Sequence, residues 1–134
     1  MSPKKISARR QFWSFSVVGF IGFLVDAGIV LALTHDGANA IVSQLIAFSI
    51  AVTVTWVGNR SWTFGKQLRR SGALQEWSLY VSANTVGWLV NNGVYVALVT
   101  AVPEITHEPV WAVAVGSVAG LLFNFTASRR VVFR

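Results

Sequence analysis

A single carboxylate, Asp26, lies deep inside an apolar stretch, and its position asks for a chemical explanation. The stretch extends from Phe12 to Thr34 and contains no other charged residue. An ionised Asp at the centre of a membrane-spanning helix costs roughly 2.5–3.5 kcal/mol, so such residues normally face a bundle interior or a wet cavity. Two interpretations follow. Asp26 is part of a path for a polar ligand, or it is a hydrogen-bonded clasp that ties the first helix to an Asn of the third.

A second chemical feature is the hexapeptide NRSWTF at 59–64, which recurs in weaker form as SRRVVF at 128–133. A guanidinium can donate two parallel hydrogen bonds to a phosphate, and aromatic side chains favour the membrane interface. Anchoring of the topology by charge and aromatic residues is the simpler alternative. The residues concerned are Asn59, Arg60, Trp62, Phe64, Arg129, Arg130 and Phe133.

The elements that carry these residues are predicted to span a membrane. The chain is 54% hydrophobic and only 12% charged, against about 25% charged in soluble domains. A spanning helix needs about 20 mostly apolar residues, and four segments qualify: 12–34, 41–57, 79–102 and 110–127. We therefore expect an all-α integral membrane protein with one four-helix domain over 1–134. The alternative for the first segment is a signal peptide cleaved near 38–40, but signal cores are shorter, about 7–15 residues.

The basic residues predict the orientation. All 11 fall before the first segment, between the second and third, or after the fourth. The positive-inside rule then places both termini and the 58–76 loop in the cytoplasm. A net charge of +6 in so apolar a chain indicates topology and anionic lipid rather than nucleic acid. The residues are Lys4, Lys5, Arg9, Arg10, Arg60, Lys66, Arg69, Arg70, Arg129, Arg130 and Arg134.

The chain contains an internal repeat. The stretch GFLVDAGIVLAL at 22–33 matches GWLVNNGVYVAL at 87–98 and pairs Asp26 with Asn91, while QFWS at 11–14 matches QEWS at 75–78. The repeat predicts two helical hairpins, 11–64 and 75–133, related by an axis along the membrane normal. Small residues every fourth position, from Ser43 to Asn59 and from Ala112 to Ser128, predict close packing of the second and fourth helices.

These features together resemble the GtrA/GtcA-type membrane proteins. The resemblance is carried by NRSWTF at the end of the second helix, by Asn124, Phe125 and Arg129 at the end of the fourth, and by the two-hairpin pattern. It implies translocation of a polyprenyl-phosphate-linked sugar across the bacterial inner membrane, for synthesis or modification of cell-surface polysaccharide. This chain departs from the family pattern at Thr55 and Ser128, where Asn is common.

The resemblance gives the candidate residues roles. Asn59 and the motif arginines (Arg60, Arg129 and Arg130) would bind the lipid phosphate. Amides both donate and accept hydrogen bonds, so a polar path would pass the head group. The path residues are Asp26, Thr55, Asn84, Asn91, Asn92 and Asn124. Aromatic contacts would come from Trp62, Phe64, Trp88 and Phe133.

Three alternatives stay open at this stage. The chain could dock a polyprenyl-phosphate glycosyltransferase without transporting anything, or export cations through Asp26. It could also be an enzyme, but we find no nucleophile–base pair, and His35 and His107 alone do not make a metal site. We therefore expect no catalysis, no cofactor and no metal. Because four thin helices enclose little space, we expect a homo-oligomer, a dimer or larger.

Overall fold

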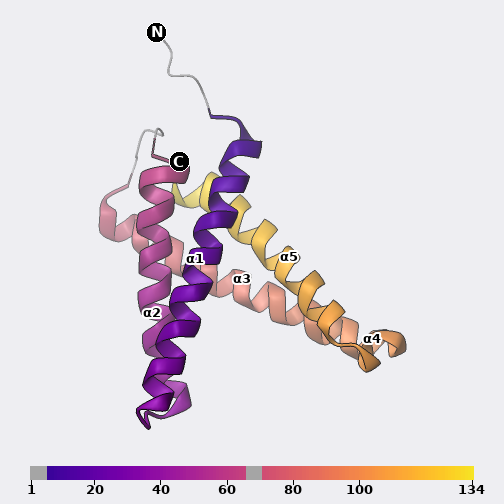
Figure 1. Ribbon diagram of the computed structural model, residues 1–134. Helices are drawn as coiled ribbons and strands as arrows, with labels where there is room; N and C mark the ends of the chain where they lie inside the picture. The colour runs from indigo at the N-terminus through magenta and orange to yellow at the C-terminus, as the bar shows by residue number, and fades with distance from the viewer. Residues whose placement is uncertain (1–5, 66–70) are drawn as a thin grey trace. The chain divides into compact units, whose positions relative to one another are not determined.

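The structure, a computed structural model, describes residues 6–65 and 71–134. Within these ranges all regular structure is helical, which confirms the predicted all-α class. The chain divides into two compact units, Met1–Arg69 and Arg70–Arg134, and each contains two long helices that lie side by side (Figure 1). Five basic residues used to predict the topology lie outside the described ranges: Lys4, Lys5, Lys66, Arg69 and Arg70.

The first unit, here the first hairpin, consists of α1 (Ala8–His35), α2 (Ala40–Gly58) and the π-helical segment η1 (Asn59–Thr63). The second hairpin consists of α3 (Ala73–Ala101), the short helix α4 (Pro103–His107), α5 (Val110–Ala127) and the π-helical segment η2 (Ser128–Val132). Both α1 and α3 begin earlier than the apolar runs at 12–34 and 79–102. Backbone hydrogen bonding continues into polar sequence there, and Ser7 caps α1 by accepting a hydrogen bond from the Arg10 amide.

The turn between α1 and α2 is tight because of its residue types. Gly37 has φ 87°, a left-handed conformation that glycine adopts without steric cost. The amide of Ala38 donates to the carbonyl of Leu33 at 2.9 Å, and the amide of Gly37 donates to that of Thr34 at 3.1 Å, which together make a Schellman motif. Asn39 then caps α2 by accepting from the amide of Ile41 at 2.9 Å. The two helices therefore reverse direction within a few residues.

The helices of the first hairpin pack through the predicted stripe of small residues. The stripe is buried from Ser43 to Asn59. At its centre Gly22 of α1 faces Thr55, and a Cβ added to Gly22 would overlap the Thr55 methyl group. Small residues allow helices to approach closely in lipid, where no hydrophobic force drives them together.

The second hairpin uses the matching positions. Gly87 of α3 faces Asn124, and an added Cβ would overlap the Asn124 amide. Gly116 and Gly120 pack on Asn91, whose backbone and side-chain oxygens would lie 2.6 and 2.7 Å from a Cβ at Gly116. Each small-residue stripe thus packs on the first helix of its own hairpin. The predicted packing of the second and fourth helices, on each other or across a dimer, stays a prediction.

Buried positions define the register of the repeat. Residues whose numbers differ by 65 are buried in both first helices: Gln11 and Glu76, Phe15 and Tyr80, Gly22 and Gly87. The predicted match of 11–14 with 75–78 is one residue out of this register. Burial of side chains, which recurs every three to four residues in a helix, sets the register more reliably than local identity of letters.

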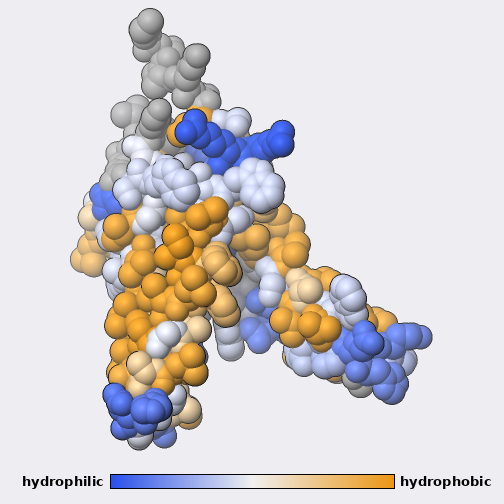
Figure 2. Space-filling view, viewed as in Figure 1, coloured by the Kyte–Doolittle hydropathy of each residue, from blue (hydrophilic) through white to orange (hydrophobic). Residues whose placement is uncertain are grey.

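Among the residues that the structure describes, three helical stretches are long and apolar enough to cross a membrane: Ala8–His35, Ala40–Thr63 and Val110–Val132. Figure 2 shows hydrophobic side chains along α1 and α2 and hydrophilic ones at the end of the pair where the turn lies. The 29-residue helix α3 is long enough but is not among the apolar spans. Its hydropathy is lowered by the polar residues Asn84, Asn91 and Asn92, with Ser82 and Thr85. The chain is a membrane protein with three apolar helices, and the fourth span stays a prediction.

Candidate functional site

Both hairpins end in a π-helical turn at the sequence motif. The amide of Phe64 donates to the carbonyl of Asn59 at 2.8 Å, and the amide of Phe133 donates to that of Ser128 at 2.9 Å. Each bond joins residues five apart, one more than in an α-helix. Such turns are rare and are found often at functional sites. We call the two segments Asn59–Phe64 and Ser128–Phe133 the motif turns.

In the first motif turn the buried polar residues satisfy each other. The hydroxyl of Thr63 donates to the amide oxygen of Asn59 at 2.8 Å, and each residue is 1% exposed. In the second turn Ser128 and Val132 occupy the matching positions and are buried as well. Asn59, predicted to bind phosphate, thus lies inside the protein and supports the turn.

Both hairpins keep buried polar atoms without hydrogen-bond partners. Within the described parts of the chain these are the amide oxygen of Gln11 and the hydroxyl of Ser43 in the first hairpin, and the amide oxygen of Asn124 and the hydroxyl of Ser128 in the second. Buried polar groups are paired in the great majority of cases. The Asn124 amide lies against Gly87 of α3 and Ser128 is fully buried, so these two side chains belong to the packing of the second hairpin.

Phe64 and Phe133 close the motif turns from inside. The Phe64 ring meets the Phe15 ring edge-on at 6.4 Å, and the Phe133 ring meets that of Tyr80 at 5.8 Å. Phe64 is 1% exposed and Phe133 is 4% exposed. Their burial assigns them to packing, where aromatic pairs contribute about 0.5–1.5 kcal/mol beyond area burial.

The arginines and Trp62 lie at the surface of the motif turns, unlike Phe64 and Phe133. Arg129, Arg130 and Trp62 are exposed. Arg60 is partly buried, and its guanidinium carbon lies 5.0 Å from the centre of the Trp56 ring, a cation–π contact between residues one helical turn apart. This contact holds the planar guanidinium beside the helix end. The motif turns thus present an arginine at the same position in each hairpin.

Asp26 has a partner that the sequence did not suggest. The amide nitrogen of Gln44 on α2 donates to its two carboxylate oxygens at 3.2 and 3.3 Å. Asp26 is therefore held within the first hairpin by Gln44, and the predicted clasp to an Asn of the third helix stays a prediction. Asp26 lies one helical turn from Gly22, toward the turn between α1 and α2. Arg60 lies five residues from Thr55, in the opposite direction along the hairpin. Along the helix axis the two charges are roughly 13 Å apart, so the structure does not bring them together.

The remaining path candidates use their side chains locally. The amide nitrogen of Asn84 donates to the carbonyl of Tyr80 at 2.9 Å, and that of Asn92 donates to the carbonyl of Trp88 at 2.8 Å. Asn92 and Trp88 are exposed on α3. Asn91 packs on α5, as described above, whereas its counterpart Asp26 reaches a side chain.

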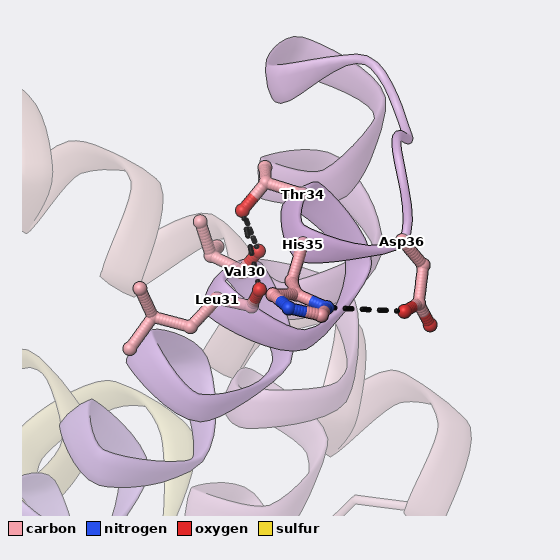
Figure 3. A network of polar contacts seen from close by, with 5 residues as sticks. All are labelled: Val30, Leu31, Thr34, His35 and Asp36. Carbon is pink, nitrogen blue, oxygen red and sulfur yellow. Dashed lines mark hydrogen bonds and ion pairs between the residues drawn. The ribbon is translucent and has the colours of Figure 1, made fainter.

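The histidines do not suggest a metal centre. Figure 3 shows His35 beside Asp36 at the end of α1, with 3.5 Å between imidazole nitrogen and carboxylate oxygen. Nearby, the Thr34 hydroxyl donates to the Val30 carbonyl at 2.7 Å. The His35 and Asp36 side chains are 90% and 81% exposed, as expected for a solvated turn. Among the described residues no three His, Asp or Glu side chains form a group suited to a metal ion.

Sequence reasoning missed two sets of polar residues. Gln44 was overlooked because it lies on an apolar helix beside the small-residue stripe, although an amide within such a helix is itself a signal. Gln11 and Glu76 are buried at matching positions, 3% and 1% exposed. The one-residue error in register hid their correspondence.

Comparison with known proteins agrees with this arrangement. Residues 14–133 match the family described as GtrA/DPMS, transmembrane domain, and this range includes most of α1, all of α2, α3 and α5, and both motif turns. No curated protein matches the chain. The family match indicates a membrane protein that acts in polyprenyl-phosphate sugar processes. The chain belongs to the GtrA/DPMS transmembrane-domain family.

Proposed function

We propose that the protein translocates a polyprenyl-phosphate-linked sugar across the bacterial cytoplasmic membrane, to supply synthesis or modification of cell-surface polysaccharide. One observation carries the proposal: each hairpin ends in a π-helical turn that holds an arginine at the same position, Arg60 in one and Arg129 in the other. A guanidinium at a membrane interface suits a lipid phosphate, because its planar fork donates paired hydrogen bonds.

In this proposal α3 is the fourth span, and both motif turns lie on the cytoplasmic side with the two termini. The distribution of the basic residues supports this orientation. The polar residues that make α3 less apolar than its neighbours are the ones expected in a helix that lines a polar path rather than facing only lipid. We also expect the functional unit to be a dimer or larger.

The head group is the part that must cross the hydrocarbon, whereas the prenyl tail stays in lipid. The exposed amide of Asn92 and the partly exposed amide of Asn84 on α3 support a role in receiving it. Asp26 and Gln44 supply a further polar contact toward the opposite end of the first hairpin. Movement of the lipid down its gradient, drawn by consumption on the outer side, needs no catalysis and no cofactor.

Transport is tested by reconstituting the protein in liposomes with a short-chain polyprenyl-phosphate sugar and measuring its protection from an external reagent. We expect transport above empty vesicles, and a loss of at least tenfold in Arg60→Gln and Arg129→Gln, which corresponds to about 1.4 kcal/mol. The matched control is Arg9→Gln, which removes one exposed positive charge outside the motif turns. Equal loss in all three variants would indicate a general charge effect and contradict the assignment.

Docking of a glycosyltransferase is the second candidate function, and the cluster of basic residues between the two hairpins favours it. If docking is the only role, replacement of Lys66, Arg69 and Arg70 abolishes polysaccharide modification in cells, while Arg60→Gln and Asp26→Asn leave it intact. If the protein translocates the lipid, Arg60→Gln should instead reduce polysaccharide modification in cells. The same assay in cells therefore separates the two functions.

A further inference from the structure

The first hairpin contains a pocket where the start of α1 meets the first motif turn. It has a volume of about 260 Å³. Its lining includes Arg10 and Ser14 from α1, and Ser61, Trp62 and Thr63 from η1. Arg60 does not line it. The pocket is therefore distinct from the motif arginine, and the wider π-helical turn supplies one of its walls.

The lining combines the groups that recognise a glycosyl phosphate. Arg10 offers a guanidinium, the side chain best suited to a phosphate. Trp62 is 55% exposed and provides an aromatic face of the kind on which an apolar face of a sugar ring can lie. The Ser61 hydroxyl already donates to the carbonyl of Val57 at 2.5 Å. Its oxygen still has an acceptor lone pair for a sugar hydroxyl.

The matching positions of the second hairpin keep a guanidinium, Arg130 at the position of Ser61, but lack the hydroxyls and the aromatic ring. Arg10 and Ser14 correspond to Gln75 and Leu79, which lack a positive charge and a hydroxyl. Trp62 corresponds to Val131, which has no aromatic ring. A feature that served only to end a hairpin would be expected in both. The difference indicates that the first hairpin carries a function that its repeat does not share.

The size of the pocket limits the ligand. Pockets for drug-sized molecules measure about 300–1,000 Å³, and this one is smaller. It suits one sugar ring with its phosphate rather than an oligosaccharide. We propose that this pocket receives a monosaccharide phosphate head group, with Arg10 on the phosphate and Trp62 on the sugar. The inference rests on the proposed function, which supplies the class of lipid, and adds the site where its head group is first held.

The chain has no cysteine, so a single introduced thiol can report occupancy. In Ser14→Cys, a short-chain prenyl-phosphate hexose should slow maleimide labelling. At about four times Kd, mass action predicts about fivefold slower labelling. Leu79→Cys, at the matching position of the second hairpin, is the control and should label at an unchanged rate. Equal protection of both thiols, or equal protection by anionic phospholipid vesicles without the sugar lipid, overturns the proposal.

A second pair of variants tests Arg10 directly. In the Ser14→Cys background, Arg10→Gln should raise Kd at least tenfold, so that the same lipid concentration slows labelling by no more than about 1.4-fold. Arg9→Gln should leave the fivefold slowing unchanged, although both variants remove one charge from α1. Protection that survives Arg10→Gln overturns the assignment. Transport without protection overturns the pocket alone, whereas protection without transport overturns translocation and supports the head-group site.

Discussion

The amide nitrogen of Gln44 lies 3.2 and 3.3 Å from the two carboxylate oxygens of Asp26, and this contact joins α1 to α2. It explains how an acidic residue is accommodated within an apolar helix, because each oxygen accepts a hydrogen bond. The second hairpin has Asn91 and Val113 at the matching positions, a pair that cannot form this contact. The contact is therefore specific to the first hairpin.

Asp26→Asn should preserve most of the stability of the first hairpin, since an amide can still accept from Gln44. Asp26→Leu and Gln44→Leu should each remove the bond, and the double variant should cost less than the sum. Interhelical hydrogen bonds in membranes average about 0.6 kcal/mol and reach about 1.7 kcal/mol in double-mutant cycles. Thermal unfolding in detergent gives the coupling energy. A coupling near zero would show that the two side chains contribute independently.

Gly22→Ala and Gly87→Ala should destabilise their hairpins by roughly 1–3 kcal/mol, the usual range for overpacking. The added methyl groups would overlap Thr55 and Asn124, respectively. Gly93→Ala is the control, because nothing lies within 4 Å of its added Cβ and alanine favours a helix by up to about 1 kcal/mol. Gly22→Ala combined with Thr55→Ala should recover stability. Destabilisation by Gly93→Ala as large as that by Gly87→Ala would refute the close approach.

Thr63→Val tests the hydrogen bond inside the first motif turn. The substitution keeps the shape, reproduces the residue type of Val132, and leaves the Asn59 amide oxygen without the donor at 2.8 Å. Loss of one hydrogen bond of this kind costs about 0.5–1.5 kcal/mol. The combined variant Asn59→Ser and Thr63→Val converts the turn to the pattern of η2 and should lose less than Thr63→Val alone. Unfolding in denaturing detergent measures the difference.

Arg60→Lys keeps the charge but removes the planar fork and weakens the contact with Trp56. If Arg60 binds a phosphate through paired hydrogen bonds, transport should fall by roughly tenfold, or about 1.4 kcal/mol. Trp56→Leu should give a smaller loss, because a partly exposed cation–π contact contributes about 0.5–1 kcal/mol. Full transport by Arg60→Lys in the liposome assay would mean that charge alone is sufficient.

The helical class, and the correspondence of Gly22 with Gly87 in the repeat, could be predicted from the sequence. Both depend on patterns within short stretches of sequence, which can be read without the structure. The register of the repeat near Gln11 could not be read correctly, because a short identity of letters outweighed the burial pattern. Hydropathy also does not decide whether α3 spans the membrane. Polar residues on a helix that lines a path lower its mean hydropathy, and the mean hydropathy is what identifies a spanning helix.

The candidate site was predictable in residue type but not in geometry. The sequence singled out Asn59, Arg60 and Phe64 without indicating which of them point outward. An aromatic residue can lie at the membrane interface or inside the protein, and residue type does not distinguish the two. The packing of Phe64 on Phe15 could therefore not be foreseen. The π-helical turn is defined by backbone hydrogen bonding between residues five apart, and residue propensities do not predict it. Gln44 and Asp26 meet only because of the rotation of α2 against α1.

The short helix α4 has a consequence for how such chains can be altered. Matching residues differ by 65 in the first helices and by 69 in the second, as Gly22 with Gly87 and Thr55 with Asn124 show. The second hairpin thus carries four additional residues in the connection between its two long helices, where α4 lies, and its motif turn keeps the same form. Chain length can change at these tips without disturbing the glycine contacts. They are therefore natural sites for epitope tags, fluorophores or inserted domains.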